Sequence, residues 1–169
     1  RKFFDNIERV IDFRGRTPKK LGMEWSDEGY IVLSALNVKD SYIDFTADVH
    51  YANQDLYDKW MVGNELYEGQ VLFTTKETMG NVAQVQDNRK YVLSQRTIAF
   101  NIDKKKVTND FLAILLRSQN VQLTLKSLAS GGTAQGVSQK SLSQLRVIVP
   151  INIKEKQKIV PINSKNKEN

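Results

Sequence analysis

Apolar and polar residues alternate in short blocks along the chain, and several of the apolar blocks have the composition of β-strands. Residues 30–38 are rich in β-branched and apolar side chains and predict a buried strand. A second strand is predicted at 71–73, and apolar character resumes at 82–85 after a polar insert. Residues 91–102 predict a further pair of strands, interrupted by the polar residues 94–96. Because polar residues within an apolar strand usually face something they bind, the interruption marks a candidate site.

Apolar positions recur at helical spacing later in the chain. They form one stripe consisting of Phe111, Leu115, Val121, Leu125 and Leu128. Thr108 or Asn109 can cap the start of this segment, and Gly131 is a plausible stop. The pattern predicts a helix at about 110–128, which at about 1.5 Å per residue is long enough to brace a small sheet.

Two other segments have helical character. Residues 53–61 predict a short helix, and apolar residues between Phe3 and Ile11 suit a short amphipathic helix or an entry segment that packs on the core. Together the elements predict the α+β class (mixed α/β). We expect a single compact domain over residues 1–150, in which a twisted, partly antiparallel sheet is braced by the helix at about 110–128.

The stretch 130–150, SGGTAQGVSQKSLSQLRVIVP, combines three kinds of local pattern. Its glycines allow positive φ and leave backbone amides uncovered. Short polar side chains follow beside Lys140, and four apolar residues then return the chain to a core before Pro150; these are Leu142, Leu145, Val147 and Val149. The pattern predicts a polar loop that is firmly anchored and can present its side chains to a partner.

Two further polar loops interrupt the apolar pattern. FRGRTPKK, at 13–20, is a basic loop with Thr17 as a possible hydrogen-bond donor to phosphate, and a merely solvated loop is equally compatible with it. TTKETMGN, at 74–81, lies between two predicted strands. If the polar loops serve one function, residues 74–81, 94–96 and 133–140 must lie together on one basic side of the scaffold, away from the carboxylate-rich region.

Charge is polarised along the 169 residues, whose net charge is +6. Residues 31–70 carry 2 basic and 7 acidic side chains, whereas residues 71–150 carry 11 basic and 4 acidic ones. Such a division predicts one face that attracts a polyanion and another that does not. The run Lys104, Lys105 and Lys106 fits a solvated turn better than a binding site.

The composition excludes several classes of chemistry. The chain has no cysteine and one histidine, which rules out disulfides and thiol chemistry and gives poor support to a transition-metal site. No nucleophile elbow, phosphate-binding loop or dinucleotide-binding glycine pattern is present. No apolar run approaches the roughly 20 residues of a membrane span, and no secretory signal is visible, so we expect a cytoplasmic protein.

The four segments RGRTPKK, EGQVLFTTKETMGNVAQV, VLSQRTIAFNI and SGGTAQGVSQKSLSQLRVIVP together resemble the target recognition domain of Type I restriction-modification DNA specificity subunits. The last segment is the most specific, because the family's domain commonly closes with Gly-Thr/Ser-x-Gln-x-x-Ile/Val-Ser, a Leu-x-x-Leu step, an apolar strand and a proline. Gln70 stands where the family often has Asp. After the proline the family's long helix is not recognisable, so residues 151–169 are expected to be the start of a truncated spacer helix or a disordered tail.

The resemblance implies sequence-specific binding of double-stranded DNA, reading one half of a bipartite target, with no catalysis by this chain. Partners would be the modification (methyltransferase) subunits and, through them, the restriction subunits. S-adenosylmethionine, ATP and Mg²⁺ would belong to those partners. We expect no cofactor or metal in this chain, and the side chains predicted to contact phosphates or bases are Arg16, Lys19, Lys20, Lys76, Thr78, Asn81, Gln95, Arg96, Gln135, Gln139 and Lys140.

Two alternatives come from other functional classes. One is a magnesium-dependent nuclease that uses Asp87, Asp103 and Lys105, although both carboxylates fall in predicted turns. The other is a non-catalytic protein-interaction module whose lysine-rich tail is only solubilising.

Overall fold

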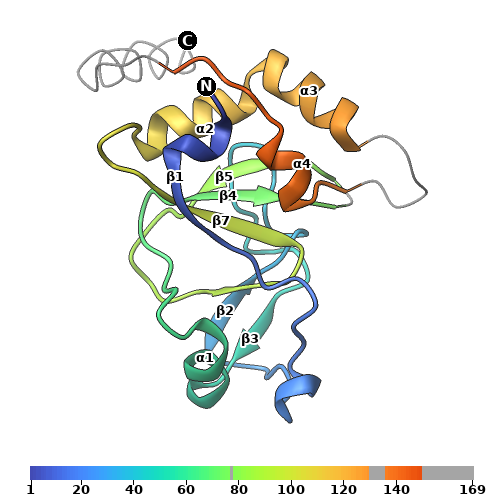
Figure 1. The fold of residues 1–169 in the computed structure, drawn as a ribbon. Helices are drawn as coiled ribbons and strands as arrows, with labels where there is room; N and C mark the ends of the chain where they lie inside the picture. The colour runs from blue at the N-terminus through green and yellow to red at the C-terminus, as the bar shows by residue number, and fades with distance from the viewer. Residues whose placement is uncertain (77, 130–135, 150–169) are drawn as a thin grey trace.

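The computed structural model describes residues 1–76, 78–129 and 136–149. Two sheets form its framework (Figure 1). The first has four antiparallel strands in the order β1-β7-β4-β5, which are Ile7–Ile11, Thr97–Ile102, Val71–Thr74 and Val82–Gln84. The second has the order β3-β2-β6, which are His50–Ala52, Tyr30–Leu33 and Val92–Leu93.

The helices flank these sheets. Figure 1 shows α2 and α3 on one side of the four-stranded sheet and α1 beside β2 and β3 at the far end of the molecule. The helices are α1 Gln54–Met61, α2 Asn109–Arg117, α3 Gln119–Ala129 and α4 Gln139–Ser143, with 3₁₀ turns η1 Phe3–Asn6 and η2 Lys19–Leu21. The predicted α+β class is confirmed, but two sheets replace the single expected one.

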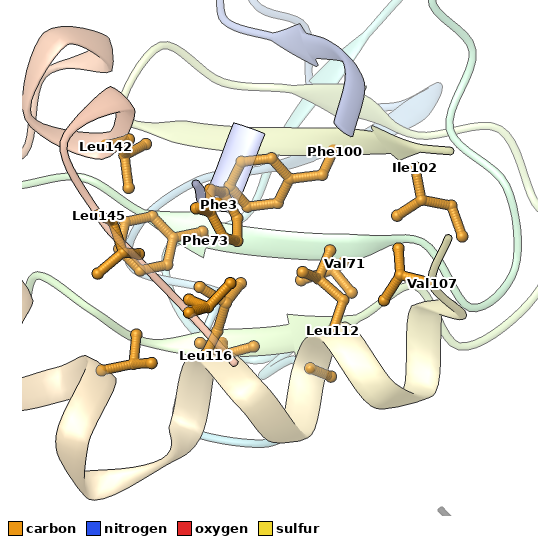
Figure 2. Close-up of a cluster of buried hydrophobic side chains, with 14 of the residues drawn as sticks. Phe3, Val71, Phe73, Phe100, Ile102, Val107, Leu112, Leu116, Leu142 and Leu145 are labelled. Atoms are coloured by element: carbon orange, nitrogen blue, oxygen red, sulfur yellow. The ribbon is translucent and has the colours of Figure 1, made fainter. Parts of the chain in front are cut away.

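Strands β7, β4 and β5 of the four-stranded sheet are buried on both faces, which explains their continuous apolar runs. Val71, Phe73 and Phe100 face a first core that is closed by η1, α2, α3 and α4 (Figure 2). The alternate residues Leu72 and Ala99 face a second core, shared with α1 and the three-stranded sheet. Because side chains alternate between the faces of a strand, each strand contributes to both cores.

The predicted helix at 110–128 is divided in two at Ser118, so the expectation of one continuous helix was wrong. Ser118 has an extended backbone, with ψ 148°. Its hydroxyl donates to the Leu115 carbonyl at 2.7 Å and accepts from the Val121 N–H at 3.4 Å, so that it closes α2 and opens α3. A serine can hydrogen-bond nearby backbone groups in place of the helical pattern. Thr108 caps α2 as predicted, accepting from the Phe111 N–H at 3.1 Å.

Of the two forms predicted for the N-terminal segment, the amphipathic helix is wrong, whereas the entry segment that packs on the core is observed, since Phe3 is fully buried in the first core. After one 3₁₀ turn the segment becomes β1, which pairs with β7 and thus enters the sheet as an edge strand. The predicted strand at 30–38 ends at Leu33, because Asn37 accepts hydrogen bonds from the Ser34 N–H and hydroxyl and holds the following residues in a turn. The proposed boundary at residue 150 stays a prediction, since 150–169 lie outside the described residues.

Candidate nucleic-acid interface

Three polar segments that are distant in sequence meet at Thr75, directly after β4. The Thr75 N–H donates to the Arg96 carbonyl at 3.1 Å, and the Thr75 carbonyl accepts from the Val137 N–H at 2.8 Å. Lys76 and Gly136 form an isolated antiparallel bridge beside them. The predicted convergence of the loops is therefore observed for residues 75–76, 96 and 136–137.

These segments surround a hollow of about 330 Å³, here called the basic hollow. Its lining residues are Arg14, Gly15, Thr75, Lys76, Gln95, Arg96, Gly136, Val137 and Ser138. Three of them are cationic, and each of these three comes from a different segment of the chain. The hollow therefore offers positive charge, side-chain amide and hydroxyl groups, and loop backbone within one small concave area, which suits contact with nucleic acid.

An acidic residue supports the rim of the basic hollow. Only 8% of the Asp12 side chain is exposed, and its carboxylate accepts from the Arg14 N–H at 3.0 Å and from Arg14 Nε at 2.9 Å. It also accepts from Gln139 Nε2 at 3.0 Å, although the two residues are 127 positions apart in the sequence. Burial acts to raise the pKa of Asp12, but the hydrogen bonds from Arg14 and Gln139 outweigh it, and the pKa lies below its usual value of 3.8.

Arg14 is thereby fixed in place. Besides its bonds to Asp12, its Nη1 donates to the Val137 carbonyl at 2.7 Å. The loop after β1 and the segment before α4 are thus joined through one guanidinium group.

The three residues predicted from the basic loop, Arg16, Lys19 and Lys20, are not part of the hollow's lining. Arg16 donates to the Trp60 carbonyl and lies 4.6 Å from the centroid of the Phe13 ring, so its guanidinium is occupied by the second core. Lys19 and Lys20 are exposed in η2, and Lys20 Nζ donates to the carbonyl of Gly15 at 2.7 Å. Of these three, Lys19 and Lys20 keep exposed charges that a phosphate could approach.

The turn between β4 and β5 is held by hydrogen bonds to the end of β4 and to the segment after β2. Thr74 Oγ1 donates to the Thr78 carbonyl at 2.7 Å and accepts from the Asn81 N–H at 2.9 Å. The Asn81 side-chain amide donates to the Val38 carbonyl at 3.1 Å, so part of its hydrogen-bonding capacity serves the fold. Thr78 is exposed, and Gln122 of α3 donates to the Gly80 carbonyl at 3.0 Å.

The predicted residues of the closing stretch lie on or before α4. Ser138 caps this helix by accepting from the Ser141 N–H at 3.0 Å, and Gln139 and Lys140 are exposed in its first turn. Gln135 lies outside the described residues. The predicted anchors are all buried; these are Leu142, Leu145, Val147 and Val149.

A second hollow of about 310 Å³ shares Gln95 and Arg96 with the basic hollow. Its other lining residues include Trp25, Leu36, Asp48 and His50. A carboxylate oxygen of Asp48 lies 3.7 Å from His50 Nε2. The carboxylate-rich region therefore reaches one edge of the site through Asp48. The described lining of the basic hollow itself includes no carboxylate, although Arg14 is paired with Asp12.

Sequence reasoning missed Asp12, Arg14 and Thr75. The spacing Asp-x-Arg was an available signal, because an aspartate can accept from the backbone N–H two residues later. Nothing in the pattern places Gln139 beside Asp12, since that contact depends on how the end of the chain folds back.

The residues proposed for a nuclease are engaged elsewhere. Asp87 accepts from Arg89 Nε at 3.0 Å and from the Tyr91 hydroxyl at 2.8 Å, while Asp103 accepts from the Lys105 N–H at 3.0 Å. In the described part of the chain, no three histidine, aspartate or glutamate side chains gather in a way that could hold a metal ion. The same part of the chain contains no helix that is long and apolar enough to cross a membrane.

Comparison with known proteins places this geometry in context. Residues 6–165 match the family model described as the Type I restriction modification DNA specificity domain. No curated protein matches the chain significantly.

Solved structures resemble it in fold. A chain from a study of complex assembly and conformational transition of the type I R-M system aligns with a TM-score of 0.69 at 14% identity. The Type I restriction-modification S subunit from M. genitalium gives 0.64 at 17%, and the HsdS subunit from Thermoanaerobacter tengcongensis gives 0.63 at 13%. The alignments cover 99%, 99% and 96% of this chain but only 37%, 38% and 35% of those chains.

Proposed function

The chain belongs to the family of Type I restriction modification DNA specificity domains, and we propose that it binds double-stranded DNA and selects the sequence through the basic hollow. The observation that carries the proposal is the meeting of three polar segments at Thr75, to which Arg14 is joined by its hydrogen bond to the Val137 carbonyl. Arg14, Lys76 and Arg96 thus surround one concave surface. The domain recognises DNA and performs no chemistry itself.

The chemistry of the hollow suits both parts of DNA recognition. Arginine and lysine bind phosphates without regard to sequence and can also bond guanine O6 and N7. Glutamine can bond adenine. Gln95 and Arg96 lie side by side in the turn between β6 and β7, so one short turn offers groups for both kinds of base.

The partners proposed for this chain are those of the specificity subunits it resembles. It would read one half of a bipartite target and deliver that choice to modification (methyltransferase) subunits, and through them to restriction subunits. S-adenosylmethionine, ATP and Mg²⁺ would be used by those partners. The place of action would be the cytoplasm.

Selection from a pool of random DNA duplexes tests the proposal, followed by titration of the selected duplex and a scrambled one at several salt concentrations. We expect the selected duplex to bind at least about 10³-fold more tightly than the scrambled one. Affinity should fall steeply with salt, and Lys76→Ala should lower the slope of log K against log[salt] by about 1. Lys104→Ala is the matched control, because Lys104 lies in the turn after β7, at the other end of that strand from Arg96.

Two outcomes would contradict the proposal. Failure to enrich any sequence would remove the DNA-recognition function, and binding insensitive to salt would favour a protein-interaction module. Incubating the chain with plasmid and Mg²⁺ tests the nuclease alternative, for which we expect no cleavage.

A further inference from the structure

Asp12 is an anion at the edge of a surface that is otherwise built to attract anions. Only 8% of its side chain is exposed, and its carboxylate oxygens already accept hydrogen bonds from within the chain, so it has little to offer DNA directly. Its hydrogen bonds go to Arg14 and to Gln139, and the second of these residues is exposed on α4 beside Ser138 of the basic hollow. The role of Asp12 must therefore be sought in what it does to these two side chains.

A carboxylate accepts hydrogen bonds and donates none, whereas the glutamine amide has a donating and an accepting side. Only the NH₂ group of Gln139 can face Asp12, because its Oε1 would be repelled by the carboxylate oxygens. The amide of Gln139 is planar, so fixing Nε2 against Asp12 turns Oε1 away from it. Without the carboxylate, the two orientations of this amide would be free to exchange.

The major-groove edge of DNA distinguishes these orientations. Adenine and cytosine present an exocyclic amino group, which donates, whereas guanine and thymine present a keto oxygen, which accepts. Building on the proposed function, we propose that Asp12 is a positioning residue that holds Gln139 with Oε1 outward, so that Gln139 reads an amino-bearing base, adenine or cytosine, at one position of the half-site.

The other contacts of Asp12 make this arrangement rigid. Arg14 bonds both to Asp12 and to the Val137 carbonyl, two residues before Gln139 in the chain. Asp12 and the start of α4 are thus linked twice, through Arg14 and through Gln139. A purely structural brace would need only the first of these links, and the test must separate the two roles.

The matched control is provided by a second Asp-x-Arg in the same chain. Asp87 accepts from the Arg89 N–H at 3.0 Å and from Arg89 Nε at 3.0 Å, as Asp12 does from Arg14. Arg89 lies outside the lining of the basic hollow. Asp87→Asn therefore removes the same kind of local carboxylate without touching Gln139.

The experiment compares selected-site profiles of the unaltered chain, Asp12→Asn, Gln139→Ala, the double variant and Asp87→Asn, with folding checked by circular dichroism. Gln139→Ala identifies the position that Gln139 reads. There the unaltered chain should prefer adenine or cytosine by about fivefold or more. Where it prefers adenine, replacing that adenine by the unsubstituted base purine, which has no amino group, should abolish the preference. Asp12→Asn should reduce the preference at that position to less than about twofold and leave the preferences at other positions unchanged. The double variant should lose no more of the preference at that position than Gln139→Ala alone.

The inference is overturned if Asp12→Asn keeps the full preference at the Gln139 position, or if that position prefers guanine or thymine. Should Asp12→Asn fail to fold, Gln139→Ala decides alone: an unchanged profile at every position overturns the inference. A chain that selects no sequence at all would instead refute the proposed function, before any variant is compared.

Discussion

Lys76 and Gly136 face each other in an isolated antiparallel bridge, which joins the loop after β4 to the segment before α4. The approach is so close that a Cβ atom on Gly136 would lie 3.1 Å from the Thr75 carbonyl oxygen. A side chain at this position would therefore press on the residue at which all three polar segments meet. The glycine is needed here for space.

Gly136→Ala should separate the two segments joined by this bridge by a few tenths of an ångström. Because overpacking typically costs about 1–3 kcal/mol, and a shift of a few tenths of an ångström relieves this contact, we expect a loss of about 1 kcal/mol in the free energy of unfolding. The selected DNA duplex should bind more weakly by a larger factor than the scrambled duplex. Urea unfolding and fluorescence anisotropy measure the two effects.

Gly69→Ala is the control for this substitution. Gly69 has φ +88° but open space around it, and it precedes β4 at the end opposite Thr75. Alanine there strains the backbone and lowers stability without reaching the basic hollow. Equal effects of the two substitutions on DNA discrimination would show that the bridge has no special part in binding.

Gln95→Ala combined with Arg96→Ala should reduce discrimination between the selected and scrambled duplexes by roughly 1–3 kcal/mol for each base that these side chains read. Both residues line the basic hollow and the second hollow, so the turn is in reach of DNA lying on either. Non-specific affinity should change little. Titrations of both duplexes at one salt concentration measure the effect, and discrimination equal to that of the unaltered chain would remove this turn from the interface.

The pattern of the sequence predicts the strands well because two cores demand apolar residues on both faces of the central sheet. It cannot distinguish one sheet from two, since β2 and β6 have the same apolar character as β4 and β7. It also cannot show that Ser118 ends one helix and begins another. An unbroken apolar stripe runs past that residue, and only its backbone hydrogen bonds reveal the break.

The candidate site was predictable at the level of segments but not of individual side chains. Loops between predicted strands were identified correctly, and their meeting at Thr75 followed the expectation that they share one side. The sequence does not show which arginine of the basic loop lines the hollow. Arg16 contacts Trp60 and Phe13, whereas Arg14, two residues earlier, lines the hollow. That choice depends on a long-range contact, which neighbouring residues do not encode.

The free energy of unfolding should depend on pH through Asp12. Burial opposes the charge, but the hydrogen bonds from Arg14 and Gln139 leave the pKa of Asp12 in the folded chain below 3.8. A lowered pKa means that this carboxylate stabilises the fold above its unfolded pKa, and that the contribution is lost as pH falls through the folded pKa. Urea unfolding between pH 7 and about pH 3 should show a steeper decline for the unaltered chain than for Asp12→Asn. Parallel curves would show that the hydrogen bonds do not favour the charged form.

Gln122 connects the helical layer to the turn that carries Thr78. Its Nε2 donates to the Gly80 carbonyl at 3.0 Å and to the Leu116 carbonyl at 2.7 Å, so one side chain at the start of α3 holds both the end of α2 and the turn between β4 and β5. Gln122→Ala removes both bonds, and at a net value of about 0.5–1.5 kcal/mol each the free energy of unfolding should fall by about 1–3 kcal/mol.

Thr108→Ala provides the comparison, because it removes the cap of α2 at a similar loss of about 1 kcal/mol without contacting the turn. If the turn belongs to the DNA interface, Gln122→Ala should also reduce discrimination between the selected and scrambled duplexes, whereas Thr108→Ala should not. Unfolding and DNA titrations of both variants under the same conditions distinguish these effects. A turn that reads DNA must be held in a fixed position. Equal discrimination by the two variants would therefore mean that the contact of α3 with the turn contributes only to the stability of the fold and not to DNA recognition.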